Sequence, residues 1–400
     1  MFVPFKRIVL FVLTALFLVS CLVNSGDEHL ALNSAPTGNF SKLQTPIICA
    51  YLHIGNRKLD LNSLKLDGVN ILNLAFTKIT NNRIGLLRPE DAQNFMIAKK
   101  LKKLYPQMKI LVSVGGYGTS KVFSDMSLSA SSRSVFVDDA IRFVRYYGLD
   151  GVDVDWEFPG MNAQTRDTDR VNFTSLLTEL RTAFDKASKQ DGKKYYLTVA
   201  AGAFDMYLTY TEIRKIEPLT DYFFVMTYDF FGQWNKTTGH HTNLYFSSLK
   251  HNGHSVDKVV KNYYKAGVPK EKIIIGAAFY GRKWKNVEAV NSGLFCKGTG
   301  VGSVAFRQIP PLLKSGKYIR SWDSSALSPT LYNPQDKIFL SYEDMQSVKR
   351  KVDYIFIHDL GGIMYWEYFS DYDYMLSKSI KEEFEIHRGG YPRISFPGKK

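Results

Sequence analysis

Eight short apolar runs are spread along the chain, separated by longer polar or amphipathic segments. Valine, isoleucine, leucine and aromatic residues dominate each run, which is typical of parallel strands buried on both faces. The runs are Ile47–Leu52, Asn70–Phe76, Lys109–Val114, Gly151–Trp156, Tyr195–Ala200, Tyr222–Thr227, Lys272–Ala277 and Gly362–Trp366. Eight such units in 400 residues predict an α/β fold, a (β/α)8 TIM barrel.

The segments between the runs support this arrangement. Helical periodicity is clear in three of them, Ala92–Leu104, Ser131–Tyr147 and Arg170–Ser188. A doubly wound open sheet is the alternative, but no glycine-rich dinucleotide motif follows an early strand. The stretch after Trp284 is too long for a plain βα unit. We therefore expect a small α+β insertion at about residues 285–338, between the seventh and eighth strands.

The fourth run carries acidic residues at alternate positions, Asp153, Asp155 and Glu157. In a strand these side chains share one face at a spacing of about 6.6 Å, while Val154 and Trp156 point the other way. Acidic residues are depleted in strands, and buried carboxylates are unfavourable unless paired or protonated. Because like charges raise the pKa of at least one member, we expect Glu157 to be a protonated general acid near neutral pH.

A metal site and a solvated edge strand are the two alternative interpretations of this acidic run. Mg²⁺ and Ca²⁺ prefer oxygen ligands but seldom take three from one strand face. A solvated edge strand would not carry valine and tryptophan on its opposite face. No His/Cys cluster elsewhere has metal-ligand spacing. We expect neither a metal nor a cofactor.

The residues from Asp150 to Glu157 resemble the DxxDxDxE signature of family 18 glycoside hydrolases, the chitinase family. The resemblance runs in order from about Ile47 to about Ile380. Each matching motif falls at the carboxyl end of an expected strand, where barrel enzymes place their active sites. The further motifs are Ser113 to Gly116, the block from Met226 to Tyr245, Tyr280 to Trp284, and Gly361 to Trp366.

The resemblance implies a retaining, substrate-assisted hydrolysis of β-1,4 linkages after N-acetylglucosamine. Glu157 would protonate the glycosidic oxygen while the substrate's own acetamido oxygen attacks the anomeric carbon. Asp155 would hold the acetamido N–H, and Asp153 would share a proton with Asp155. Tyr228 would donate its hydroxyl to the acetamido oxygen.

Further substrate contacts are expected in or beside the same motifs. Trp366 is expected to form the floor on which a sugar stacks. Asp229 has a helix N-cap as its alternative role, and Arg282 an ordinary salt bridge. His240 is expected to be structural. The full set of expected binding residues is Met226, Asp229, Trp366, Arg282, Gly116, Tyr117, Phe158, Tyr51, Phe76, Trp234 and Tyr280.

Some positions depart from the family's pattern. Tyr117 follows the paired glycines where many members have tryptophan, and Phe158 follows Glu157 where many have tyrosine. The first strand has His53-Ile54 where a tryptophan is usual shortly after Tyr51. These changes leave the expected chemistry intact and concern the outer parts of the sugar-binding cleft.

The N-terminal residues predict export. Lys6 and Arg7 precede an apolar run, Ile8 to Val19, that is too short to span a bilayer. The residues Leu18 to Cys21 resemble a bacterial lipobox, which would attach the protein to a membrane through a lipid on Cys21; a plain signal peptide is the alternative. We therefore expect a secreted or envelope-anchored protein. Its expected parts are a signal (1–21), a flexible linker (22–44), the catalytic barrel (45–386) and a basic tail (387–400).

The net charge of +14 favours anionic surroundings. Lysine and arginine are dispersed rather than clustered with an aromatic nucleic-acid motif, so nucleic-acid binding is not expected. Of three cysteines, Cys49 and Cys296 follow the signal. Two cysteines make no disulfide framework, so we expect both to be free. We also expect the protein to be a monomer.

The sequence therefore predicts a chitinase acting on chitin or chitooligosaccharides. A sugar-binding lectin on the same barrel is the alternative from another class, although lectin-like members usually lose the acid that Glu157 supplies here. An endo-acetylglucosaminidase or a peptidoglycan hydrolase would keep the chemistry and change the polymer. The block from Met226 to Tyr245 and the expected insertion favour the chitinase.

Overall fold

The computed structural model describes residues 46–161 and 164–389. The predicted signal, lipobox and linker lie outside these residues, as does the predicted tail beyond Gly389. Helix α10 (Met375–Arg388) includes the first two residues of that tail. In the described part of the chain, no helix has the length and apolar character needed to cross a bilayer.

Eight parallel strands close into a barrel, which confirms the predicted fold class and all eight apolar runs. The first strand pairs with both the second and the last, and Tyr51 lies opposite Trp366 in this closing register. The barrel strands are β1 (Ile47–His53), β2 (Ile71–Thr80), β4 (Lys109–Gly115), β5 (Gly151–Asp155), β6 (Tyr196–Ala201), β7 (Tyr222–Val225), β8 (Ile273–Ala278) and β14 (Gly362–Trp366). A short strand, β3 (Arg83–Gly85), extends β2 as an antiparallel hairpin.

Helices connect the strands, and the three predicted ones are confirmed. Helix α3 shows how the sequence sets their ends: Ser129 accepts a hydrogen bond from the backbone of Ser132, and Gly148 ends the helix at a φ of 68°. The helices beside the barrel are α1 (Asp91–Leu104), α2 (Ser120–Ser127), α3 (Ala130–Tyr147), α4 (Asp169–Asp191), α5 (Asp205–Thr209), α6 (Ile213–Ile216), α7 (Val256–Ala266), α9 (Met345–His358) and α10.

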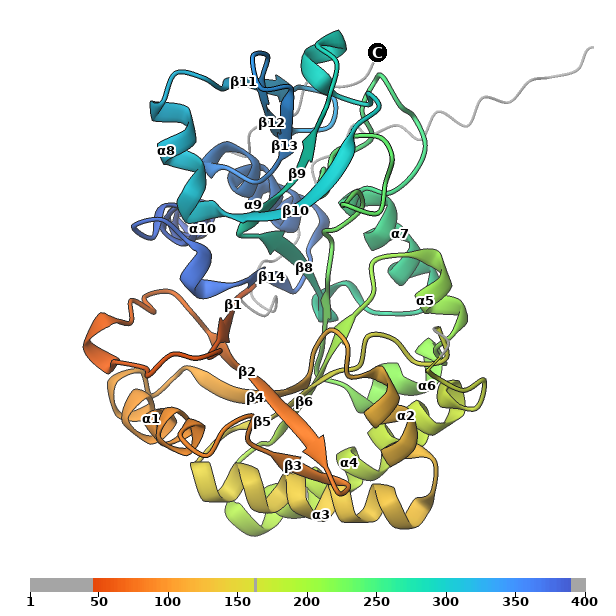
Figure 1. Ribbon diagram of the computed structural model, residues 1–400. Helices are drawn as coiled ribbons and strands as arrows, with labels where there is room; N and C mark the ends of the chain where they lie inside the picture. The colour runs from red at the N-terminus through yellow and green to blue at the C-terminus, as the bar shows by residue number, and fades with distance from the viewer. Residues whose placement is uncertain (1–45, 162–163, 390–400) are drawn as a thin grey trace, which may run out of the picture. The chain divides into compact units, whose positions relative to one another are not determined.

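The predicted α+β insertion is confirmed between β8 and β14, and Figure 1 shows it in cyan and blue. It is a five-stranded antiparallel sheet in the order β10-β9-β13-β12-β11. The sheet begins at Tyr280 and ends at Ser341, so it is a few residues longer at each end than predicted. Its elements are β9 (Tyr280–Lys285), β10 (Thr299–Ala305), α8 (Ile309–Lys314), β11 (Ile319–Asp323), β12 (Ser328–Asn333) and β13 (Ile338–Ser341).

The barrel has two separate apolar layers. The larger one lies between the strands and the helices, where alternate strand residues such as Val152 and Val154 are fully buried. The smaller one fills the barrel interior and includes Cys49, Leu111 and Met364. Cys49 is buried, and both it and Cys296 are free, as predicted. Asp153 is also fully buried, so a carboxyl group lies in the barrel beside this apolar layer.

Candidate active site

Asp153 lies in the middle of β5 and is held by hydrogen bonds from both neighbouring strands, β4 and β6, and from β1 across the barrel. Its carboxylate accepts from Tyr51 Oη (2.9 Å), Ser113 Oγ (2.7 Å) and Thr198 Oγ1 (2.7 Å). Burial raises the pKa of Asp153 above its usual range, and the three hydrogen bonds reduce that rise. Thr198 was not predicted, because its role depends on a register that sets it opposite Asp153.

Asp155 ends β5 and is almost completely buried. Its Oδ1 atom has no hydrogen-bond partner in the described part of the chain. Burial, and then the charges of Glu157 and Asp153, raise the pKa of Asp155 well above the range of an ordinary aspartate. A buried acceptor without a donor is unfavourable in a protein interior. This oxygen is therefore suited to a ligand that brings an N–H or O–H group.

Glu157 follows the strand end by two residues and is partly exposed. Burial, and then the charge of Asp229, raise the pKa of Glu157 to about 7. The sequence predicted that the acids of the same strand raise the pKa of Glu157. In the structure the charge that raises it is that of Asp229, in the loop after β7. Near neutral pH the protonated and ionised forms of Glu157 coexist, which a group that first gives and then takes a proton requires.

Tyr228 lies three residues beyond β7, facing the same acids. Burial, and then the charges of Asp155 and Glu157, raise the pKa of Tyr228 well above its usual range, so the phenol stays a neutral donor. Its ring packs directly on Gly276 of β8, where an added Cβ would lie 2.7 Å from Tyr228 Cε1. A side chain at Gly276 would therefore displace the tyrosine.

Asp229 is held in an ionised state by the insertion. It accepts hydrogen bonds from Arg282 Nε (2.7 Å), Arg282 Nη2 (2.5 Å) and Tyr280 Oη (2.8 Å). Burial works to raise its pKa, but the nearby His241 ring, with Nδ1 3.8 Å away, and the Arg282 guanidinium lower it below the usual range. The helix N-cap alternative for Asp229 is wrong, because the next helix along the chain, α7, begins at Val256.

Several predicted binding residues lie together at the carboxyl ends of β1, β2 and β14. The ring of Trp366 stacks 5.3 Å from that of Phe76 and lies 5.9 Å from Tyr51. An added Cβ at Gly116 would lie 2.9 Å from the Phe76 ring. Met226 and Tyr228 pack against the same interior layer. These side chains form an aromatic wall beside the acids.

Other predicted residues lie apart from that wall. Phe158 packs against Phe204 (5.0 Å) and Tyr207 (5.7 Å) beside the outer layer. Tyr117 is 92% exposed, and Trp234 is 57% exposed beneath the Arg282 guanidinium at 5.2 Å. Their substrate contacts stay predictions.

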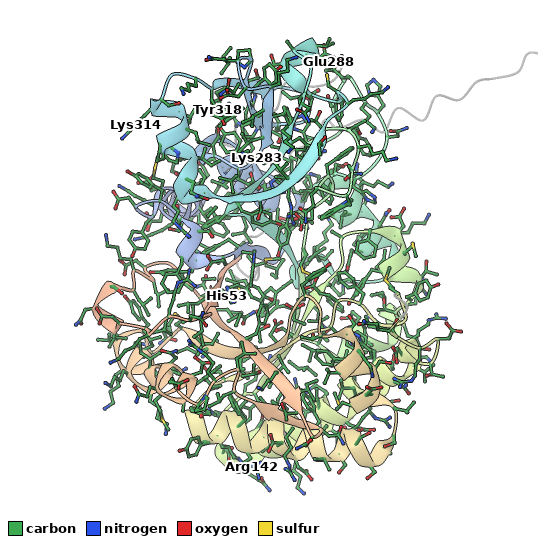
Figure 2. All side chains as sticks on the ribbon, viewed as in Figure 1. His53, Arg142, Lys283, Glu288, Lys314 and Tyr318 are labelled. Carbon is green, nitrogen blue, oxygen red and sulfur yellow. The ribbon has the colours of Figure 1, made fainter. Side chains whose placement is uncertain are left out.

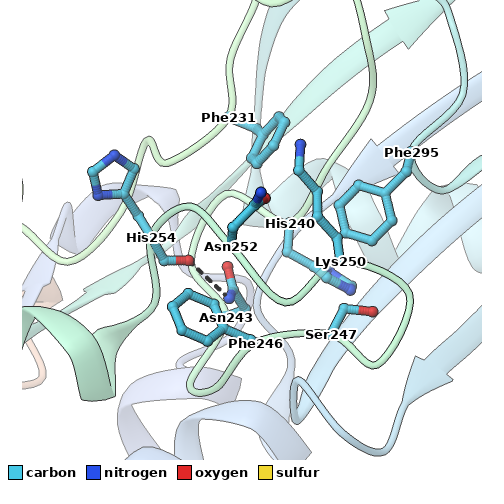
Figure 3. Close-up of a pocket in the computed structure, with 9 residues that line it drawn as sticks. All are labelled: Phe231, His240, Asn243, Phe246, Ser247, Lys250, Asn252, His254 and Phe295. Atoms are coloured by element: carbon cyan, nitrogen blue, oxygen red, sulfur yellow. Dashed lines mark hydrogen bonds between the residues drawn. The ribbon is translucent and has the colours of Figure 1, made fainter. Parts of the chain in front are cut away.

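His240, predicted to be structural, is buried, with Nε2 3.1 Å from Asp323 Oδ2. It also lines a separate, shallow cavity, whose lining residues come mostly from the loop between β7 and α7 (Figure 3). The ammonium of Lys250 lies over the rings of Phe231 (4.8 Å) and Phe295 (5.5 Å) there. None of the β5 acids lines this cavity.

One group among the described residues has the spacing of a metal site: Asp353, Glu383 and His387 on α9 and α10. Lys349 and Arg350 already pair with its two carboxylates, at 3.7 Å and 2.9 Å, so its charge is balanced without an ion. The β5 acids do not form such a group.

Comparisons with known proteins agree with this geometry. Residues 47–371 match the family model for the glycosyl hydrolases family 18. Chitinase A1 of Niallia circulans is 36% identical over 312 residues, which cover 73% of this chain and 45% of that protein. The chain thus spans just under half the length of this relative.

Two solved structures are similar over most of the chain. A family 18 N-acetylglucosaminidase from Paenibacillus barengoltzii is 35% identical with a TM-score of 0.77, covering 84% of this chain and 99% of that one. A chitinase-like agglutinin from Robinia pseudoacacia is 27% identical with a TM-score of 0.75, covering 84% and 99%.

Proposed function

The chain belongs to family 18 of the glycosyl hydrolases, and from that premise we propose that it is a chitinase with Glu157 as its acid and base. The observation that carries the proposal is the pair formed by Glu157, whose pKa is about 7, and Asp155, which has an unpartnered buried oxygen. The first can transfer a proton at neutral pH, and the second can receive an N–H group from a sugar.

In the proposed reaction, Glu157 gives its proton to the glycosidic oxygen as that bond breaks. The acetamido oxygen of the same sugar attacks the anomeric carbon and forms an oxazolinium ring. Asp155 Oδ1 accepts the acetamido N–H and stabilises the positive charge that develops there. The ionised Glu157 then takes a proton from water, which opens the ring with net retention of configuration.

Asp153 and Tyr228 support this step in different ways. Asp153 and Asp155 both have raised pKa values, so the two groups share a proton more readily than they both ionise. When Asp155 ionises in the transition state, the shared proton passes to Asp153, which its three hydrogen-bond partners hold in place. Tyr228 supplies a neutral hydroxyl to orient the acetamido oxygen.

The substrate would lie on the aromatic wall. Trp366 and Phe76 offer ring faces on which a pyranose stacks, and Arg282 of the insertion pairs with Asp229 of the loop after β7. The insertion sheet lies at the carboxyl ends of the barrel strands, so it lengthens the surface available to an oligosaccharide. Chitin and chitooligosaccharides fit these requirements.

The lectin alternative has its own support in the likeness to an agglutinin. The retained acid with a tuned pKa favours catalysis over binding alone. The likeness to an N-acetylglucosaminidase keeps removal of single terminal sugars as a second mode of the same chemistry.

The test is mass spectrometry of chitin hexasaccharide incubated with the purified protein and with Glu157→Gln. We expect shorter products from the wild type only, and their lengths distinguish internal from terminal cleavage. Binding without products from either protein would favour the lectin. A parallel incubation uses peptidoglycan strands. Products from peptidoglycan but not from chitin would identify peptidoglycan as the substrate.

The proposed location is the cell envelope, through a lipid on Cys21. We expect the protein to fractionate with membranes and Cys21→Ala to be released in soluble form. Release of both proteins alike would leave ordinary secretion as the explanation.

A further inference from the structure

His53 is a polar residue in the aromatic wall that the predicted site does not include. It is the last residue of β1, and its register partner is Ala75, which precedes Phe76. Tyr51, two residues before it, pairs with Trp366. Figure 2 shows His53 near the centre of the view, between the barrel strands and the insertion.

The imidazole ring lies against the predicted sugar floor. Its centroid is 5.6 Å from Trp366 with a tilt of 34°, and 6.0 Å from Phe76. Apart from the backbone pairing of β1 with β2, the hydrogen bond at His53 runs from Arg57 Nη1 to the His53 backbone carbonyl (3.1 Å). Neither ring nitrogen has a hydrogen-bond partner among the described residues.

Gly55 and the Arg57 guanidinium lie on one side of the ring. Gly55 has a φ of 51°, and a Cβ at that position would lie 3.3 Å from Arg57 Nη1 and 3.7 Å from His53 Cε1. Where many family members have a tryptophan shortly after the tyrosine of this strand, this chain has His53-Ile54. Because the imidazole is partly exposed and adjoins Trp366, a saccharide that stacks on Trp366 can reach its edge.

Two charged groups face His53 from neighbouring segments. Burial lowers its pKa, the Glu367 carboxylate after β14 raises it, and the Arg57 guanidinium lowers it, with a net lowering. The ring is consequently neutral at pH 7, with one N–H donor and one acceptor nitrogen.

We propose that His53 is a specificity-determining substrate contact that hydrogen-bonds a hydroxyl of the saccharide stacked on Trp366. A sugar hydroxyl both donates and accepts, so it matches the two nitrogens of a neutral imidazole. The apolar rings of Trp366 and Phe76 provide contact area for the sugar, whereas the hydrogen bond to His53 sets its orientation. The inference rests on the proposed function, since it takes Trp366 as the sugar floor.

Protonation changes this contact in a defined way. An imidazolium has two donors and no acceptor, so it cannot accept from the sugar hydroxyl. The KM of the wild type is therefore expected to rise on the acid side of the pH profile. Because the chemical step depends on other groups, protonation of His53 should leave kcat unchanged.

The experiment compares KM and kcat for chitin hexasaccharide in the wild type, His53→Phe and His53→Gln. Phenylalanine keeps a ring but removes both polar atoms, and we expect it to raise KM about tenfold with kcat within about twofold. Glutamine keeps a donor and an acceptor without titrating, so it should restore most of the KM and remove its rise in acid. His251→Gln, at an exposed histidine in the loop before α7, is the matched control and should leave both constants unchanged.

An unchanged KM in His53→Phe would overturn the inference. Equal rises in KM for His53→Phe and His53→Gln would also overturn it, because they would indicate a packing role. Thermal unfolding of each variant checks the fold. If the wild type gives no products, the proposed function is wrong, but the role of His53 can still be tested. Kd values of the wild type and the variants for the same oligosaccharide, measured by calorimetry, then replace KM.

Discussion

Two clusters of buried ionisable groups lie close to the barrel strands, and one of them contains a cation. Glu343 and Lys351 form an ion pair in which each side chain is 1% exposed. Lys351 Nζ also donates to Thr242 Oγ1 (2.6 Å) and to the Gly276 carbonyl (3.0 Å). By contrast, no lysine or arginine of the described residues pairs with Asp153, Asp155 or Glu157.

The difference shows what each cluster does. Glu343 has a counter-charge and hydrogen bonds, and the cluster joins α9 to β8 and the loop after β7. The β5 acids have no counter-charge, so burial raises their pKa values. The cluster of Glu343 and Lys351, which is balanced in charge, stabilises the fold. The unbalanced cluster of β5 acids contains an acid that can transfer a proton.

The largest expected effect is on catalysis at the unbalanced cluster. Glu157→Gln keeps the shape of the side chain and removes the transferable proton, so kcat should fall about a thousandfold. Oligosaccharide binding should be retained. Steady-state kinetics and calorimetry measure the two quantities, and Glu385→Gln, at an exposed position on α10, is the control. Turnover at the wild-type rate would rule out Glu157 as the acid.

The matching substitution at the balanced cluster should act on stability. Lys351→Met leaves the Glu343 carboxylate buried without its cation, and the free energy of unfolding should fall by about 3–5 kcal/mol. Adding Glu343→Gln to the same chain should recover most of the loss. Denaturant unfolding measures both variants. No recovery in the double variant would mean that packing, rather than charge balance, dominates.

A smaller effect is expected from the middle acid. Asp155→Asn removes the charge that stabilises the acetamido group in the transition state, and kcat should fall about a hundredfold. Because a carboxamide fits the same space, the melting temperature should not fall. A kcat within twofold of the wild type would show that the charge of Asp155 has no part in the reaction.

The smallest effect is expected from Asp229, which acts on the pKa of Glu157 and pairs with Arg282 of the insertion. Asp229 raises the pKa of Glu157, so Asp229→Asn should lower that pKa and move the alkaline limb of the kcat/KM profile about one pH unit toward acid. Arg282, left unpaired, would act in the same direction. Asp60→Asn, at an exposed site, is the control. A shift toward alkaline pH would contradict the assigned electrostatics.

The sequence predicted the fold well, because eight apolar runs and their turn residues depend on local chemistry. It also placed Asp153, Asp155 and Glu157 together from alternation alone, although β5 ends at Asp155. It missed Thr198, whose contact with Asp153 depends on strand register. It also missed the Asp229 charge at Glu157, because a loop from another strand brings the two together.

The motif from Tyr280 to Trp284 shows a second limit. It was expected at the end of a barrel strand, but it forms the first strand of the insertion. Apolar content does not show where the barrel strand ends and the insertion strand begins, because β9 follows β8 almost directly in the chain. His53 was seen only as a departure from a pattern, and its position beside Trp366 required the closing register of the barrel.

The most direct test is the titration of Glu157 itself, by ¹³C NMR of protein labelled at glutamate Cδ, with Glu157→Gln used to assign its signal. Acids buried without counter-charge predict an apparent pKa near 7 for this carboxyl. A titration near the ordinary glutamate value of about 4.3 would contradict that prediction and remove the physical basis for Glu157 as the acid.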